Sequence, residues 1–220
     1  MTYIIVAGGT VEDESFRGFI DELDESSLFI VACDSGYDTC IRLNIRPELV
    51  IGDFDSAREG TYEKVLASKI PVIKLDSIKD DTDTEAALKW IFNNSNPDDE
   101  IYIWGGTGTR IDHVMGNISL IGMGTLAGRK IIMLDGHNRI NMIRSDEVFL
   151  VTGHGQYGKY ISVFPYMGKV RGLTMEGFKY PLTDAELKGF DTLTVSNELI
   201  AEKGVISIKE GYLLVMETRD

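Results

Sequence analysis

The chain has few cysteines, few prolines and no long apolar run, and each shortage narrows what it can be. Its 220 residues include 2 cysteines and 5 prolines. Cys33 and Cys40 provide no disulfide framework, and their spacing suits two buried thiols beside a strand-to-helix junction. No apolar stretch approaches the ~20 residues of a membrane-spanning helix. The first residues lack the basic region and long apolar stretch of a signal peptide, so we expect a cytoplasmic protein with no membrane partner.

Basic side chains are also few. The 22 Lys and Arg residues are outnumbered by 35 Asp and Glu residues, so the formal net charge is −13. Duplex nucleic acid and anionic membranes favour basic surfaces, so we expect neither as a partner. An acidic protein that binds phosphates needs local help from metal ions, a few Lys or Arg side chains, or backbone N–H groups. A hydrophobic content of 43% and a charged content of 26% are ordinary for a globular protein with a substantial core.

The hydrophobic pattern changes near residue 136. Before it, apolar strand-like runs alternate with helical patterns, at residues 3–7, 28–33, 49–51, 71–75, 101–104 and 130–134. This alternation predicts an α/β domain with a parallel, helix-covered sheet over residues 1–135. After it, short β-like runs dominate, at residues 149–152, 160–164, 205–208 and 212–216. They predict a mostly antiparallel β domain over residues 136–220.

Two acids follow the apolar run at residues 49–51. Gly52 ends the run, and Asp53 and Asp55 come next. Residues two apart in an extended backbone point the same way, so the two carboxylates would converge. Convergent carboxylates repel each other unless they share a proton or a cation, and hard oxygen ligands suit Mg²⁺ together with substrate phosphates. The alternative is a polar turn, because Gly and Asp are common turn residues.

A second acidic stretch precedes the apolar positions of a predicted helix. Thr82 and Glu85 have the spacing of a capping box, and acids in a first helical turn are favoured by the helix dipole alone. The aspartates between residues 80 and 83 nevertheless exceed what a cap needs. Asp83 is therefore a candidate to complete the carboxylate set, and Lys79 adds a charge that suits phosphate.

A glycine-rich turn follows the run at residues 101–104. Gly105 and Gly106 begin it, and such a turn lets backbone N–H groups approach an anion. It is neither a P-loop nor a dinucleotide fingerprint. Arg110 can grip a phosphate in two places. Asp112 is either the helix N-cap or a group that orients a substrate, and His113 is either structural or a phosphate contact.

Asp34 belongs with these groups by position, because it ends the apolar run at residues 28–33. A turn or a cap would explain it equally well. Four strands of the first half thus end in acidic or glycine-rich loops, which would share one edge of a parallel sheet. The acids in these loops favour metal-assisted phosphate chemistry.

These segments together resemble the thiamine pyrophosphokinase family. Three stretches occur in the family's order: Gly-Asp-Phe-Asp-Ser at 52–56, Lys-Asp-Asp-Thr-Asp-Thr-Glu at 79–85 and Gly-Thr-Arg-Ile-Asp-His at 108–113. The segment at 34–36 is similar to the family's Asp-Gly-Gly, and the one at 196–198 to its Ser-Asn element. Ser35 replaces the family's usual Gly, and Tyr37 is bulkier than its usual small residue.

The resemblance implies an enzyme that transfers the pyrophosphoryl group of ATP to the thiamine hydroxyl, giving thiamine diphosphate and AMP. It also implies Mg²⁺ held by Asp53, Asp55 and Asp83, which with Asp112 form the catalytic set. The implied ATP-binding residues are Asp34, Gly36, Gly52, Ser56, Lys79, Thr82, Gly105, Gly106, Arg110 and His113. The implied thiamine contacts are Asp112, Ser196 and Asn197. A homodimer follows from the resemblance too, with thiamine bound near the subunit interface and partly by the β domain.

The residues alone are also compatible with two other functions. Asp53 and Asp55 after an apolar strand are also typical of haloacid-dehalogenase phosphatases, although Gly52 before them and the lack of a following Gly-Thr count against that reading. A non-catalytic sensor of nucleotide or thiamine could use the same fold, although intact acids in all the loops favour catalysis. The residues leave the proton acceptor for the thiamine hydroxyl open.

Overall fold

The computed structural model describes residues 1–55, 60–76, 78 and 80–220, and the chain forms two compact units. Unit 1 is Met1–Gly136 and unit 2 is His137–Asp220. Ser56 and Lys79, two of the predicted ATP-binding residues, lie outside the described residues. No helix within the described ranges is long and apolar enough to cross a membrane.

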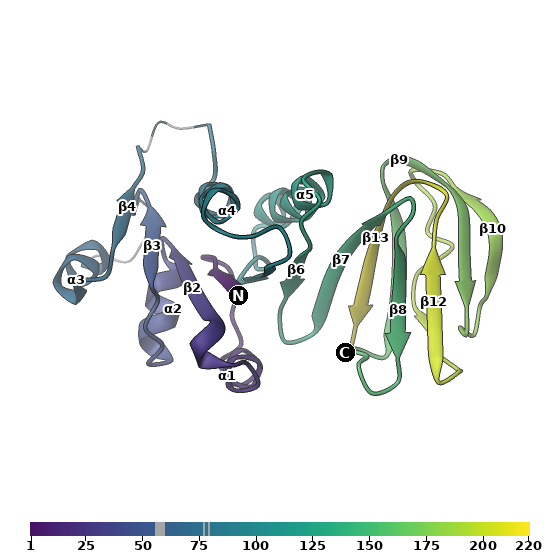
Figure 1. Cartoon of the computed structure of the whole chain (residues 1–220), viewed down its shortest axis with the longest axis horizontal. Coiled ribbons are helices and arrows are strands. Elements are labelled where there is room, and N and C mark those ends of the chain that lie inside the picture. Colours follow the sequence, from purple (N-terminus) through teal and green to yellow (C-terminus); the bar gives the residue numbers. More distant parts are fainter. Residues whose placement is uncertain (56–59, 77, 79) are drawn as a thin grey trace. The chain divides into compact units, whose positions relative to one another are not determined.

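Unit 1 is built on a parallel sheet, which confirms the α/β prediction for this half (Figure 1). Its strands are β1 (Thr2–Val6), β2 (Leu28–Cys33), β3 (Leu49–Gly52), β4 (Val72–Lys74), β5 (Glu100–Trp104) and β6 (Ile131–Leu134). They lie in the order β4-β3-β2-β1-β5-β6. The sheet grows from β1 toward β4, and the chain then returns to the other side of β1 to add β5. The strand order therefore reverses between β1 and β5.

Helices cover both faces of this sheet. They are α1 (Asp13–Asp21), α2 (Gly36–Arg42), α3 (Thr61–Ser68), α4 (Asp83–Asn94) and α5 (Ile111–Leu126), with a short 3₁₀ helix at Glu25–Ser27. Phe16 of α1 packs on Trp104 with ring centroids 5.0 Å apart, and Trp90 of α4 stacks on Phe29 at 5.5 Å. Through the strand register Phe29 shares a face with Ile101, three residues from Trp104. Since alternate strand residues face opposite ways, α1 and α4 cover opposite faces.

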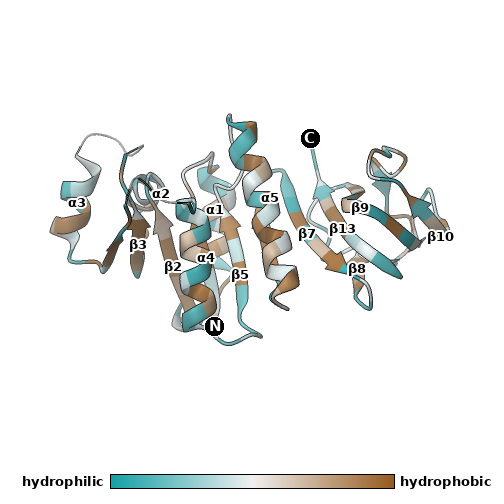
Figure 2. Ribbon diagram, turned by 90° about the horizontal axis from the view of Figure 1, so that it is seen from above, coloured by the Kyte–Doolittle hydropathy of each residue, from teal (hydrophilic) through white to brown (hydrophobic). Residues whose placement is uncertain are grey.

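Local sequence explains these elements. The residues of β3 are all buried, as expected for a parallel strand covered on both faces, and Figure 2 shows hydrophobic residues along β3 and α5. The hydroxyl of Thr82 caps α4 by accepting a hydrogen bond from the Glu85 N–H at 3.2 Å. Of the predicted capping box, the structure shows the hydrogen bond from the Glu85 N–H to the Thr82 hydroxyl. The Glu85 carboxylate forms an ion pair with Lys89 at 2.9 Å.

Unit 2 is an antiparallel β structure, which confirms the prediction for the second half. Its strands are β7 (Asn138–Arg144), β8 (Val148–Thr152), β9 (Tyr160–Glu176), β10 (Leu182–Leu187), β11 (Asn197–Glu198), β12 (Lys203–Ser207) and β13 (Glu210–Thr218). The first part of β9 pairs with β13, and its second part pairs with β10 and β12. Between them Met167 and Gly168 have φ of 55° and 133°, so β9 turns there and serves both parts of the unit.

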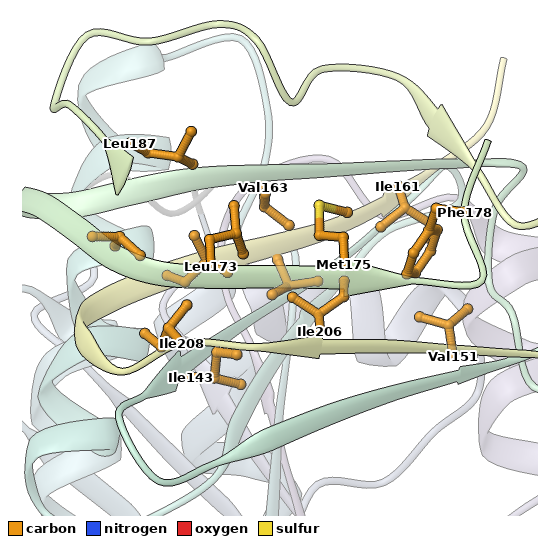
Figure 3. Close-up of a cluster of buried hydrophobic side chains, with 13 residues drawn as sticks. Ile143, Val151, Ile161, Val163, Leu173, Met175, Phe178, Leu187, Ile206 and Ile208 are labelled. Atoms are coloured by element: carbon orange, nitrogen blue, oxygen red, sulfur yellow. The ribbon is translucent and has the colours of Figure 1, made fainter. Parts of the chain in front are cut away.

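The core of unit 2 consists of aliphatic side chains from several strands and one aromatic ring. Val163, Leu173 and Met175 of β9 lie beside Ile206 of β12, with Phe178 closing one end (Figure 3). All five are at most 2% exposed. Because β9 supplies core residues to both of its pairings, it holds this unit together.

Candidate active site

A cavity of about 290 Å³ lies at the carboxyl edge of the parallel sheet. Its walls are the loop after β1 (residues 7–9), the loop after β2 (33–35), the start of α4 (82–84) and the turn from β5 into α5 (105–110). Ligands of open α/β sheets bind outside the carboxyl ends of the strands, where the strand order reverses. The cavity occupies that position, between the loops that follow β1 and β5.

Glycines allow the loops after β1 and β5 to touch. The Gly9 N–H donates to the Gly105 carbonyl at 2.9 Å, and the Thr10 N–H donates to the Thr107 carbonyl at 2.8 Å. A Cβ on Gly9 would lie 2.1 Å from the Thr107 oxygen, and Gly105 has φ of 69°, which favours glycine. At Gly106 a Cβ would lie 2.4 Å from the Met133 sulfur. These glycines shape the cavity through close packing.

Asp34 lines the cavity from the end of β2 and is 4% exposed. Its backbone has φ of 47°, and its N–H donates to the Ile51 carbonyl at 3.0 Å. Gly52 passes close to it, because a Cβ there would lie 3.1 Å from the Asp34 nitrogen. Gly36 begins α2 outside the cavity lining and packs on β1, where a Cβ would lie 1.9 Å from the Val6 oxygen. Gly36 and Gly52 thus have packing reasons to be glycine.

The predicted metal ligands occupy two neighbouring elements. Asp53 and Asp55 follow β3, and the Asp55 N–H donates to the Asp53 carboxylate at 3.1 Å. Asp83 begins α4 and lines the cavity with Thr82. Among the described residues, no group of three or more His, Cys, Asp or Glu side chains is arranged to hold a metal ion. Mg²⁺ commonly takes one or two carboxylates and completes its shell with water and substrate phosphates, so the donors present suit it chemically.

Arg110 and Asp112 form a two-pronged ion pair at the start of α5. The distances are 2.6 Å from Nη2 to Oδ2 and 3.2 Å from Nε to Oδ1, and both side chains are exposed. The hydrogen bonds from Arg110 lower the pKa of Asp112 to about 2, with help from the His113 N–H. Asp112 is therefore ionised at neutral pH, which makes it a weak base and suits contact with a cation.

One face of α5 borders the cavity. Arg110, just before the helix, and His113, Val114 and Asn117 within it all line the cavity. Positions three, four and seven residues apart share one side of a helix. The sequence predicted Arg110 and His113 as site residues but not Asn117, although the helical spacing of Asn117 from them was the available signal. The other lining residues that it did not assign include Gly8, Gly9, Cys33, Ser35, Thr107 and Gly108.

Ser196 and Asn197 lie in unit 2. Asn197 is 3% exposed, and its side-chain oxygen accepts hydrogen bonds from the N–H groups of Tyr180 and Glu198 at 3.0 and 2.9 Å. Its amide nitrogen donates to the Tyr180 carbonyl at 2.8 Å. Ser196 is exposed with φ of 59°. Asn197 therefore fastens the chain at Tyr180, and the expected contact with thiamine stays a prediction.

Comparison with protein families covers both units. Residues 20–133 match the family model "Thiamin pyrophosphokinase, catalytic domain", and residues 141–213 match "Thiamin pyrophosphokinase, vitamin B1 binding domain". The chain belongs to the thiamine pyrophosphokinase family. The resemblance seen in the sequence is thereby confirmed, and the chain is an enzyme of the diphosphotransferase type.

Individual thiamine pyrophosphokinases are similar to this chain over its full length. The thiamine pyrophosphokinase of Bacillus subtilis (strain 168) is 34% identical over 223 residues, which cover 100% of this chain and 99% of the relative. The crystal structure of the Bacillus subtilis enzyme superposes with a TM-score of 0.88 at 32% identity, covering 100% of both chains. That of the Geobacillus thermodenitrificans protein gives 0.85 at 31% identity, covering 100% of this chain and 98% of that one.

Proposed function

We propose that the chain transfers the pyrophosphoryl group of ATP to the hydroxyl group of thiamine, forming thiamine diphosphate and AMP. The observation that supports this most directly is the cavity at the strand reversal. It combines two glycine turns with a guanidinium, an imidazole and the carboxylates of Asp34 and Asp83. Family membership over both units supports the same reaction.

Charge neutralisation is the first requirement of this transfer, because the chain is acidic and ATP is an anion. Asp53, Asp55 and Asp83 are the residues that would hold Mg²⁺, which when bound would offset part of the phosphate charge. Arg110 would contact phosphate oxygens through its guanidinium, whose Nε and Nη2 hold Asp112 and whose Nη1 does not. Backbone N–H groups of the turn after β5 would add donors without adding charge.

In the chemical step, the thiamine hydroxyl oxygen forms a bond to the β-phosphorus of ATP. The bond from that phosphorus to the oxygen bridging the α- and β-phosphorus breaks, and AMP leaves in line. Asp112 would attract the cationic thiamine, since it stays ionised and its low pKa makes it a poor proton acceptor. The hydroxyl proton leaves late, because the pKa of an alcohol lies far above that of a carboxylate.

The test is product analysis with purified chain, ATP, Mg²⁺ and thiamine. We expect equal amounts of AMP and thiamine diphosphate, with both abolished by EDTA and strongly reduced by Asp53→Asn. Asp98→Asn is the matched control, because Asp98 is exposed and lies just before β5, at the opposite edge of the sheet. ADP or free phosphate would instead indicate a kinase or a phosphatase. ATP binding without any product would indicate a sensor.

We propose further that the active form is a cytoplasmic homodimer, as the family resemblance implies. Unit 2 exposes large apolar side chains, with Phe190, Leu193 and Ile200 at least 70% exposed. A homodimer would bury these side chains if they share one contiguous patch, which is typical of association surfaces. Light scattering after size exclusion should give a mass near twice the 24.5 kDa of one chain. A monomer with full activity at the same concentration would contradict the dimer.

A further inference from the structure

The turn from β5 into α5 is anchored through three consecutive carbonyl groups. The loop after β1 holds two of them, since its N–H groups donate to the carbonyls of Gly105 and Thr107 at 2.9 and 2.8 Å. The carbonyl between them, that of Gly106, accepts a hydrogen bond from the Asn117 side-chain nitrogen at 2.8 Å. Asn117 reaches it from the second turn of α5 and is 8% exposed.

These anchors also orient the N–H groups of the turn. The chain contains no cis peptide bond among its described residues, and in a planar trans peptide the N–H points opposite to the preceding carbonyl. The N–H groups of Gly106, Thr107 and Gly108 therefore point away from the groups that hold the carbonyls. All three residues line the cavity, and no hydrogen bond found within the described part of the chain uses these N–H groups. The Thr107 N–H is thus directed away from α5, and the Gly106 and Gly108 N–H groups are directed away from the loop after β1. Backbone N–H groups of a glycine-rich turn that lines a cavity can bind an anion.

We propose that Asn117 is a positioning residue that presets this turn for the phosphates of ATP. The inference rests on the proposed function, which supplies ATP as the ligand. Of the groups that hold the three carbonyls in the described residues, Asn117 alone is a side chain, so a substitution can remove it. The Thr107 hydroxyl is held separately, by the Asp135 carboxylate at 2.8 Å. Its burial matters, because water cannot easily replace the lost donor at the Gly106 carbonyl.

Two variants remove the donor in different ways. Asn117→Ala removes it together with side-chain volume, and Asn117→Leu removes it while keeping a side chain of similar size. Thr125→Val is the matched control, because Thr125 is 6% exposed on the same helix and its hydroxyl donates to the Ile121 carbonyl at 3.1 Å. Thr125 lies outside the cavity lining. All three variants lose one buried hydrogen bond, and only those at position 117 release the turn.

The measurements are the Kd of ATP with Mg²⁺ by calorimetry, the KM of each substrate, kcat and the melting temperature. We expect both Asn117 variants to raise the Kd and KM for ATP about tenfold, because a buried carbonyl loses its partner and the turn loses its orientation. The KM for thiamine should stay within about twofold, and Thr125→Val should lower the melting temperature with unchanged ATP affinity. Unchanged ATP affinity in folded Asn117 variants would overturn the proposal. An equal loss of affinity in Thr125→Val would overturn it as well.

A measurement on the unaltered chain avoids any failure of the variants to fold. Titration with inorganic triphosphate and Mg²⁺ should move the amide NMR signals of Gly106, Thr107 and Gly108 downfield, and unmoved signals would contradict the inference. The two proposals also fail differently. An unaltered chain that binds ATP without forming AMP refutes the proposed function, whereas an active enzyme whose ATP affinity ignores Asn117 refutes only this inference.

Discussion

At the scale of single residues, Arg110 lowers the pKa of Asp112. Replacing it by Gln should raise the pKa of Asp112 from about 2 toward its ordinary value of 3.8, because the hydrogen bonds from Arg110 are the main cause of the shift. The pKa is depressed, so the stabilisation it represents is present above pH ~3.8 and lost as the pH falls toward ~2. NMR titration of the Asp112 carboxyl carbon measures this. An unchanged pKa in the variant would show that another group controls it.

Cys40 should be chemically inert in the folded chain. Burial, followed by the nearby Glu48 charge, raises the pKa of its thiol to about 12. The reactive thiolate should therefore be rare near neutral pH, and a thiol reagent should label Cys40 only after unfolding. Above pH ~9 the unfolded chain loses the thiol proton first, so this residue should lower stability as the pH rises toward 12. Rapid labelling of native Cys40, located by peptide mapping, would contradict its burial.

Individual site residues were predictable where chain position alone brings them to the sheet edge. Asp34 and Arg110 border the cavity because each follows a strand of the parallel sheet. Asn117 was missed although its helical spacing from Arg110 and His113 was visible, since a polar residue inside a helix resembles a surface residue until Gly106 is seen beside it. At Asn197 the structure shows hydrogen bonds between the side-chain amide and the Tyr180 backbone, and the thiamine contact implied by its short motif stays a prediction.

At the scale of elements, the start of α4 depends on its cap. Thr82→Ala should lower the free energy of unfolding by ~1 kcal/mol, because it removes the acceptor for the Glu85 N–H. Thr82→Ser keeps a hydroxyl and should retain most of the stability. Urea denaturation with an unchanged m-value measures the difference. Equal stability of the Ala variant would mean that the cap contributes nothing.

Strand β13 carries a buried ion pair that should be important for unit 2. Glu217 is 0% exposed, and it accepts hydrogen bonds from Arg139 Nε at 2.5 Å and from the Tyr157 N–H at 3.0 Å. Glu217→Ala should reduce the free energy of unfolding by about 3–5 kcal/mol, because it leaves a partly buried guanidinium without its partner.

The matched control for Glu217→Ala lies on the same strand. Glu210 pairs with Arg171 at 2.9 Å at the surface, so Glu210→Ala should change the free energy of unfolding by less than ~1 kcal/mol. Denaturation followed by circular dichroism, together with amide exchange along β13, compares the two variants. Similar effects of both would show that burial of Glu217 does not strengthen the pair.

Strands were predictable where an apolar run marks them. They were missed where a polar segment becomes a strand by pairing with a neighbouring strand. The runs of unit 1 correspond to β1 through β6 because both faces of a parallel sheet are covered. β7 was missed, since it opens with Asn138 and Arg139, and β10 was missed because it contains Thr183, Asp184 and Glu186. β7 is a strand because it pairs antiparallel with β13, and β10 is a strand because it pairs antiparallel with β9.

At the scale of the whole molecule, the change of pattern near residue 136 was the most useful signal. It predicted an α/β half and an antiparallel half, and the structure divides after Gly136. The spacing of apolar residues in a helix or a strand is a local property of the chain, so it can be recognised in the sequence. The closeness of the loops after β1 and β5 is not local, because it depends on strand order, and only the structure shows that these loops touch.

The central claim is that a pyrophosphoryl group moves as one unit, and phosphorus-labelled ATP tests it most directly. Two parallel reactions with thiamine and Mg²⁺ would use ATP labelled at the β-phosphorus or at the γ-phosphorus. We predict that both labels enter thiamine diphosphate in equal amounts and that the accompanying AMP is unlabelled. Label from the γ-position alone, with ADP as the nucleotide product, would contradict the account.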